Sequence, residues 1–277
     1  MRPDDNKQKT LGTQSAKLIA ALYDLNREIF GIEDVCELTG LPNDSARSLV
    51  RKLVLRGLVT RLKPGLFQLV PFQLGSEREF VGNPYVVARA LIQPHTYYIS
   101  HASAMDIHGM LTQPQFAVYI TTPVRHRPMN VHGYDYCFVR TKPEHFFGIT
   151  KHWVDKQQQV LVSDLEKTII DGLKQPEHCG GFTEVAKAFW IRRSEMDIER
   201  LVDYALRLDI GIVAKRLGFM LDTFGVTEPE QIKRLQAKAK RPYLLLDPIM
   251  PNEGSYQSRW KLRVNVEPDE IRSLVRT

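Results

Sequence analysis

The chain has 277 residues, of which 43% are hydrophobic and 25% charged, a composition typical of soluble globular proteins. No apolar run approaches the roughly 20 residues that span a bilayer, and the polar N-terminus MRPDDNKQKT does not resemble a signal peptide. The three cysteines lie far apart and form no C-x-x-C pair, which predicts reduced thiols in a cytoplasmic protein. The net charge of +6 favours a polyanionic partner but does not identify one.

Two short helices are expected at the start of the chain. After a polar leader of about ten residues, Thr13 or Ser15 can cap a helix that ends near Asn26. The segment IEDVCELT, residues 32–39, predicts a second helix that ends at Gly40. The Leu-Pro pair that follows predicts a turn before a third helix.

The third helix is expected to begin at Asn43, which is a favourable N-cap residue. Four apolar residues recur at helical spacing and form one stripe: Ala46, Leu49, Val50 and Leu53. Polar and basic side chains occupy the remaining surface. Gly57 then predicts the end of the helix.

Two strand-like runs follow, residues 59–62 and 66–70, joined by Lys63-Pro64-Gly65, which predicts a type II turn. Between Asn43 and Lys63 there are six basic residues and one acidic residue, a local net charge of +5. A basic helix followed by a basic hairpin predicts the recognition helix and wing of a winged helix-turn-helix. The candidate DNA-binding residues are Ser45, Arg47, Ser48, Arg51, Lys52, Arg61 and Lys63.

The larger part of the chain mixes strands and helices without a regular β-α-β alternation. Strands are expected near residues 97–99, 116–121, 134–140, 159–162, 243–246 and 260–266, and most of 182–235 is expected to be helical. Capping boxes are expected at Ser163 with Glu166 and at residues 227–230. The predicted fold class is therefore α+β, with a winged helix-turn-helix over residues 1–75 and a larger mixed α+β domain over 76–277.

Candidate catalytic and metal-binding residues do not form a recognisable site. His101 and His108 are seven residues apart, whereas a zinc helix would place its pair at i and i+4. Lys167 and Asp171 have the spacing of a helix ion pair worth about 0.3 kcal/mol. There is no glycine-rich phosphate loop and no nucleophile elbow. We therefore expect no enzyme activity, no cofactor and no metal.

A basic loop, Arg125-His126-Arg127, has two open interpretations, a contact for phosphate or a partner protein and a solvated loop. The sequence favours neither strongly enough to assign the loop a role.

The order of several motifs in the larger part resembles one protein family. YYISHASAMDIHGML, VYITTP, YDYCFVR and VSDLEKTIIDGL follow one another, and DIERLVDYALRLDIGIVAKRLGFMLDTFGV and RWKLRVNV complete the pattern. Together with the preceding winged helix, this order is similar to the AbiEi-type antitoxins of bacterial type IV toxin–antitoxin systems. The resemblance covers nearly the whole chain from about Ser15, and it depends on the order of the motifs because each motif alone is weak.

The resemblance implies a transcriptional autorepressor that binds inverted repeats in its own promoter as double-stranded DNA. It also implies that the protein counteracts a nucleotidyltransferase-like toxin. Two alternatives remain at this stage: an enzyme that modifies the toxin, for example a kinase-like one, and a winged-helix regulator whose C-terminal domain senses a ligand. No membrane partner is expected.

Overall fold

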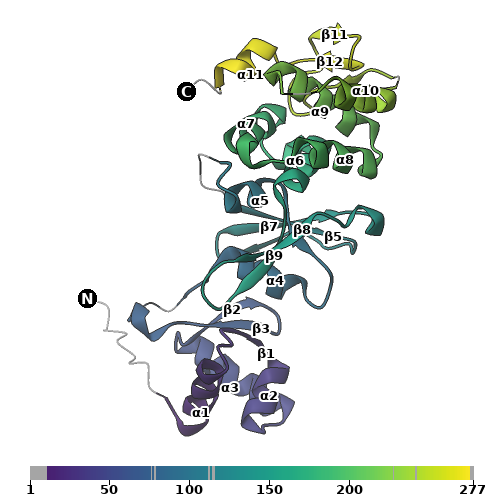
Figure 1. Cartoon of the computed structure of the whole chain (residues 1–277). Helices are drawn as coiled ribbons and strands as arrows, with labels where there is room; N and C mark the ends of the chain where they lie inside the picture. Colours follow the sequence, from purple (N-terminus) through teal and green to yellow (C-terminus); the bar gives the residue numbers. More distant parts are fainter. Residues whose placement is uncertain are drawn as a thin grey trace, which may run out of the picture. The chain divides into compact units, whose positions relative to one another are not determined.

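The computed structural model of the chain describes residues 11–75, 77, 79–111, 113, 116–226, 228–240 and 242–274 (Figure 1). The chain divides into two compact units. The first unit runs to Pro94 and includes two short later segments, residues 130–134 and 153–159. The second unit contains the remaining residues. As predicted, the fold is mixed α+β, with an N-terminal winged helix-turn-helix and a larger α+β part.

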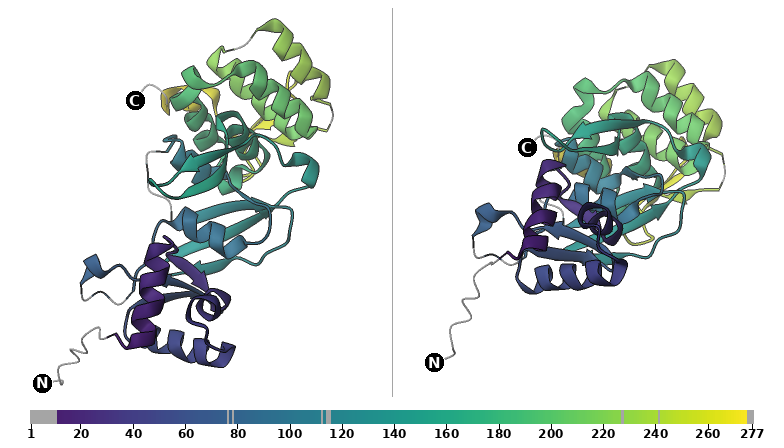
Figure 2. Two further views of the ribbon diagram at one scale, coloured as in Figure 1. Left: turned by 60° about the horizontal axis from the view of Figure 1, so that its bottom comes forward. Right: turned by 90° about the horizontal axis from the view of Figure 1, so that it is seen from below.

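The first unit begins with the six elements of a winged helix, in the order helix, strand, helix, helix, strand, strand. Their bounds are α1 Thr13–Asp24, β1 Ile29–Gly31, α2 Ile32–Thr39, α3 Asn43–Leu55, β2 Val59–Lys63 and β3 Leu66–Leu69. The three strands form one sheet in the order β1-β3-β2, with both pairs antiparallel. Figure 2 shows the three helices around this small sheet.

Apolar side chains from all three helices and the sheet form one core in the first unit, which includes Leu18, Leu22, Val35, Leu53 and Phe67. The predicted stripe of α3 faces the core: Ala46, Val50 and Leu53 are buried, and Leu49 is half-buried against them. Gly65 has a φ of +81°, as the third position of a type II turn requires.

The beginning of α3 differs from the prediction. Pro42 occupies the N-cap position and Asn43 is the first helical residue, so Asn43 does not cap the helix. Its side chain instead accepts a hydrogen bond from Arg47, one turn along the helix. The short strand β1 was not predicted, because three residues are too few to show an alternating pattern.

After a 3-10 helix at Phe72–Leu74, the first unit continues past the predicted division at residue 75 and includes helix α4 at Pro84–Ile92. The intervening segment is tied to the wing strands by side chains. The Thr60 hydroxyl accepts a hydrogen bond from the backbone N–H of Phe80 at 2.9 Å, and the Gln68 amide oxygen accepts one from Gly82 at 3.2 Å. These contacts explain why the chain stays with the winged helix up to α4.

A six-stranded sheet has the order β6-β7-β5-β4-β9-β8, and most of its residues belong to the second unit. The bounds are β4 Tyr98–Ile99, β5 Ala117–Thr122, β6 Met129–Val131, β7 Tyr134–Arg140, β8 Ile149–Trp153 and β9 Gln159–Ser163. The central pairs are mixed, since β4 is antiparallel to β5 and parallel to β9, and β5 is parallel to β7. The short helix α5, His101–Ile107, follows β4 and packs on β5.

The rest of the second unit is mostly helical, as predicted for this region. Its helices are α6 Leu165–Lys174, α7 Phe182–Arg192, α8 Ile198–Leu208, α9 Gly211–Phe224, α10 Pro229–Lys238 and α11 Pro268–Leu274, with 3-10 turns at Pro143–His145, Pro176–His178 and Arg193–Glu195. A small sheet has the order β10-β12-β11, with β10 Leu244–Leu245, β11 Ser255–Gln257 and β12 Leu262–Val264.

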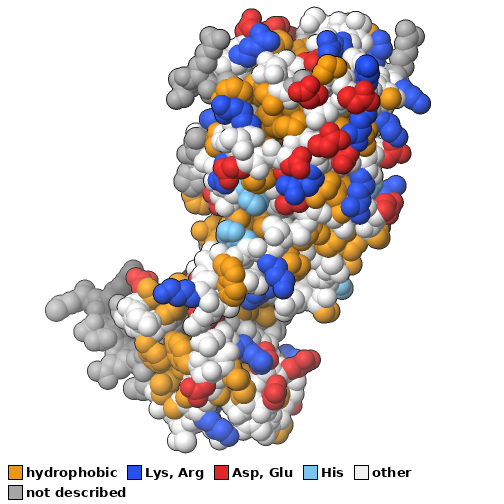
Figure 3. Space-filling model, in the orientation of Figure 1, with side chains coloured by type: hydrophobic (Ala, Val, Ile, Leu, Met, Phe, Trp, Pro, Cys, Tyr) orange, Lys and Arg blue, Asp and Glu red, His pale blue; other side chains and the backbone are white. Residues whose placement is uncertain are grey.

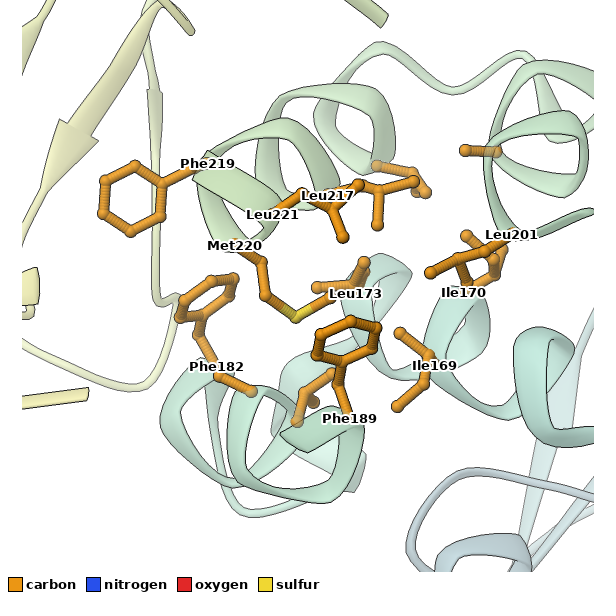
Figure 4. Packing of buried hydrophobic residues seen from close by; sticks show 14 of the residues in the cluster. Ile169, Ile170, Leu173, Phe182, Phe189, Leu201, Leu217, Phe219, Met220 and Leu221 are labelled. Atoms are coloured by element: carbon orange, nitrogen blue, oxygen red, sulfur yellow. The ribbon is translucent and has the colours of Figure 1, made fainter. Parts of the chain in front are cut away.

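Helix α6 is the centre of the helical core, because α5, α7, α8 and α9 all pack against it. Figure 4 shows Ile169, Ile170 and Leu173 of α6 among side chains from α7, α8 and α9. Gly218 on α9 allows the helix backbone to lie close to the ring of Trp260. A Cβ atom at this position would lie 2.2 Å from the ring of buried Trp260. A side chain larger than hydrogen would therefore displace the indole.

The predicted cap of α6 is wrong. Asp164, not Ser163, is the N-cap, and its carboxylate accepts a hydrogen bond from the N–H of Lys167 at 2.7 Å. Glu166 instead accepts bonds from the N–H of Asp197 and from Arg200, both at 2.8 Å. Of the second predicted capping box, Thr227 lies outside the described residues, and Glu228 with Gln231 forms the box at α10.

Candidate nucleic-acid interface

Three arginines from α3 and the wing meet around one groove of about 270 Å³ in the first unit. Arg47 and Arg51 come from α3 and Arg61 from β2. The groove is completed by apolar and backbone atoms of Ile32, Val54, Pro64, Gly65 and Phe67. The structure thus brings together the two segments that the sequence predicts as recognition helix and wing.

The burial pattern explains why these arginines face outward. In α3 the buried positions take up one face, so Arg47 and Arg51, four residues apart, share the exposed face. In β2 the neighbours of Arg61 on either side, Thr60 and Leu62, are buried, and the strand period therefore places Arg61 outside.

Among the residues that the structure describes, no carboxylate neutralises the arginines around the groove. Within the described part of the chain, none of Arg47, Arg51 and Arg61 forms an ion pair. By contrast, Arg27, between α1 and β1 in the same unit, is paired with Asp34. Guanidinium groups donate hydrogen bonds in a planar fork that suits phosphate and the edge of guanine. The groove therefore has the chemistry of a nucleic-acid contact.

Asn43 has a role that the sequence prediction missed. Its side-chain oxygen accepts a hydrogen bond from Nε of Arg47 at 2.6 Å. This bond occupies one donor of the guanidinium and orients the arginine at the first turn of α3, while neither terminal nitrogen bonds to another of the described residues. The i, i+4 spacing of Asn and Arg is the sequence signal for this contact.

The remaining predicted residues divide into two groups. Ser45, Ser48 and Lys52 are exposed on α3 but do not line the groove. Lys63 is directed elsewhere: its ammonium donates a hydrogen bond to the carbonyl oxygen of Leu91 in α4 at 2.8 Å. Burial lowers the pKa of this amine. Of the two predicted wing cations, only Arg61 therefore lines the groove.

The acid–base cluster on α6 in the second unit is buried and internally bonded. Lys167 pairs with Asp171, and its ammonium donates to the hydroxyl of Tyr98 at 3.0 Å. Tyr98 in turn donates to Asp171 at 3.0 Å. Burial and the neighbouring Asp171 carboxylate raise the pKa of Tyr98 well above its usual value. The predicted helix ion pair between Lys167 and Asp171 is thus confirmed, but the pair is almost fully buried, so the value of about 0.3 kcal/mol for a pair on a helix surface does not apply to it.

The histidines considered as metal ligands have other contacts. His108 bonds through Nε2 to the carbonyl oxygen of Ser163 at 2.7 Å. His101 is fully buried, with its Nδ1 2.8 Å from the Ser100 hydroxyl, and burial lowers its pKa to about 3. No group of three or more potential ligands was found among the described residues.

In the basic loop, the ring of His126 packs against the rings of His95 and Phe138, with centroids 5.2 and 5.1 Å apart. Arg125 and Arg127 on either side are exposed. The two arginines are thus the members of this loop that a partner can reach.

Comparisons with known proteins add information on the fold alone. No family model and no curated protein matches the chain. A solved structure described as the crystal structure of RV2827C protein from Mycobacterium tuberculosis is similar, with a TM-score of 0.71 and 16% sequence identity. The similarity covers 98% of this chain and 97% of that chain. None of the helices in the described residues has the length and apolar character needed to cross a membrane. The chain therefore shares its fold over nearly its full length with that mycobacterial protein.

Proposed function

We propose that the protein is a DNA-binding transcriptional autorepressor and antitoxin of the AbiEi type, acting in the cytoplasm. The observation that supports DNA binding is the groove between α3 and the wing, where Arg47, Arg51 and Arg61 meet without counter-charges among the described residues. The antitoxin part of the proposal depends on the resemblance in motif order through the second unit.

The DNA partner is an inverted repeat in the protein's own promoter. The recognition helix enters the major groove, where Arg47 and Arg51 reach base edges, and Arg61 on the wing meets the phosphate backbone. Ser45 and Ser48, on the first two turns of α3, add short hydroxyl donors for phosphate. The protein partner is a nucleotidyltransferase-like toxin.

Repression is tested by measuring, with fluorescence anisotropy, how tightly the protein binds the DNA duplex upstream of its own gene. The full chain should bind this duplex more tightly than a scrambled duplex, and Arg47→Ala/Arg51→Ala should remove the preference. Lys233→Ala is the matched control, since Lys233 is an exposed cation on α10 in the other unit. Equal binding of both duplexes by the full chain would contradict the proposal.

The test of toxin neutralisation uses the same double variant. If the second unit counteracts the toxin, cells that express the neighbouring toxin gene should be rescued by Arg47→Ala/Arg51→Ala as well as by the full chain. Toxin expressed from an unrelated promoter separates this effect from repression. If only the unchanged protein, which still binds DNA, rescued the cells, the protein would act by lowering toxin expression.

A further inference from the structure

The second unit contains a hollow whose charged lining is almost entirely cationic. It has a volume of about 610 Å³ and is lined by Pro123, Arg140, Thr141, Lys142, Pro143, His145, Lys174 and Ile210. On the molecular face in Figure 3, by contrast, the helical part of the second unit presents Lys and Arg interspersed with Asp and Glu. A hollow lined by three cations and a histidine, without an acidic residue in its lining, therefore differs in charge from that mixed surface.

The cations come from three separate elements. Arg140 is the last residue of β7, Lys142 and His145 belong to the following turn, and Lys174 is the last residue of α6. Within the described residues, Arg140 and Lys174 form no hydrogen bond or ion pair through their side chains. Lys142 reaches the carboxylate of Glu144 at 3.8 Å, and both of these side chains are largely exposed.

Burial and neighbouring cations disfavour the charged forms of Lys174 and His145 in the unliganded protein. Burial lowers the pKa of Lys174; Asp171 opposes this, and Lys167 and Lys142 add smaller repulsions. Burial and the nearby Lys174 also lower the pKa of His145; Glu144 opposes them, and Lys142 adds a smaller repulsion. Like charges held close together are relieved when an anion binds between them.

Size and charge decide what kind of anion fits. A hollow of this volume falls within the roughly 300–1,000 Å³ of small-molecule pockets, whereas a DNA duplex cannot enter it. A single carboxylate would balance only one of the three permanent cations. Linked phosphates balance two or three and accept hydrogen bonds from arginine and lysine. Pro123, Pro143 and Ile210 supply an apolar wall for an organic group beside the phosphates.

We propose that Arg140, Lys142, His145 and Lys174 form a binding site for a small oligophosphate, as carried by a nucleoside di- or triphosphate. The site lies within the second unit, whereas the DNA-binding groove lies within the first. The proposal goes beyond DNA binding and toxin neutralisation, and it supplies a ligand class for a regulator that senses a small molecule.

Isothermal titration of the full chain with sodium tripolyphosphate and, separately, with ATP tests the site. Saturable binding of at least one of them is expected, and Arg140→Gln or Lys142→Gln should each weaken it roughly tenfold, because each removes a charge-assisted bond. Lys233→Gln removes the same charge elsewhere and should leave the affinity unchanged. Tighter binding of ATP would assign a role to the apolar wall, and equal binding would assign the site to the phosphates alone.

Lys142→Gln is not expected to disturb folding, because the Lys142 side chain is largely exposed. A variant is used only if its midpoint of urea unfolding equals that of the unchanged protein. The proposal is overturned if neither compound binds, or if Lys233→Gln weakens binding as much as the pocket variants do. A third arm measures the promoter duplex. If Arg140→Gln weakens duplex binding and no small oligophosphate binds, the cations belong to a nucleic-acid surface instead. Loss of DNA binding by the groove variants is a separate readout, so the two proposals can fail independently.

Discussion

Helices α3 and α6 carry charged residues at the same spacing but use them in opposite ways. On α3, Arg47 and Arg51 are four residues apart, exposed and not ion-paired within the described residues. On α6, Lys167 and Asp171 are also four residues apart, but they are almost fully buried and paired with each other. The difference shows that the helical repeat fixes which residues share a face, whereas tertiary packing decides whether that face meets solvent or core.

The contrast follows from the number of neighbours around each helix. Helix α3 packs on one side only, against α2 and β2, so its other side can meet DNA. Helix α6 is surrounded by four helices, and its buried charged residues Glu166, Lys167 and Asp171 have partners inside the protein. The charge on the outer face of α3 is available for binding, whereas the charge at these three positions of α6 is satisfied within the fold.

The largest expected effect comes from breaking the buried pair. Lys167→Met leaves the Asp171 carboxylate without its cation and should lower the free energy of unfolding by about 3–5 kcal/mol. Urea unfolding at pH 7 measures this value. The double change Lys167→Met/Asp171→Leu should recover most of the loss, because no unpaired buried charge remains. A loss below 1 kcal/mol in the single variant would mean that the pair is not closed in solution.

Matched changes on α3 should act on binding and not on stability. Arg47→Ala and Arg51→Ala should each weaken binding to the specific duplex by about 1–3 kcal/mol. Asn43→Ala should have a smaller effect in the same direction, because it removes only the bond that orients Arg47. Unfolding in urea should remain nearly unchanged in all three variants. A variant with a lower free energy of unfolding but unchanged affinity for the duplex would contradict the conclusion that the charges on α3 serve binding.

How far the sequence predicted the fold depends on the kind of signal. Helix α2 and strand β7 match the predicted residues, because a glycine ends the first and a long alternating pattern defines the second. The strands β6, β8 and β11 were not predicted, although each lies beside the strand that follows it in the chain. β6 and β11 have only three residues, and β8 has no buried residue, so none of them shows a clear alternating pattern. The cap of α6 was assigned to Ser163, although the following Asp164 is an equally favourable cap residue.

The candidate site shows a similar division. Sequence predicted the residue types on α3 and the wing, because a local excess of charge is visible along the chain. It did not predict that Lys63 bonds to α4, since this contact joins residues 28 positions apart. The cationic hollow was also invisible, because Arg140, Lys142 and Lys174 come from elements that only the tertiary fold brings together.

Buried histidine gives a pH-dependent effect in the second unit. Burial lowers the pKa of His101 to about 3, so the folded protein keeps this ring neutral while the unfolded chain binds a proton below its ordinary value of 6.5. Stability is therefore fully present above pH 6.5 and falls as the pH drops toward 3, by about 1.4 kcal/mol for each pH unit. Urea titrations at several pH values measure this slope.

His101→Asn should reduce the slope between pH 6 and 4 by the contribution of one proton. Asparagine suits the position because the φ of His101 is +52°, a left-handed conformation that Asn adopts more readily than most residues. Other histidines whose pKa burial lowers, including the half-buried His108, retain their share of the slope. An unchanged slope in the variant would show that His101 is protonated in the folded protein or reached by water.

The smallest expected effect separates the two wing cations. Arg61 lines the groove, and its replacement by alanine should weaken binding to specific and scrambled duplexes alike, because a wing residue beside the groove meets phosphate. The slope of log K against log salt should fall by about one unit. Lys63→Ala also removes one positive charge, two residues further along the wing. The Lys63 ammonium, however, donates a hydrogen bond to the carbonyl oxygen of Leu91. That variant should keep the salt slope of the unchanged protein and lose about 1 kcal/mol of stability with the hydrogen bond. Equal loss of slope in both variants would show that Lys63 leaves α4 when DNA binds.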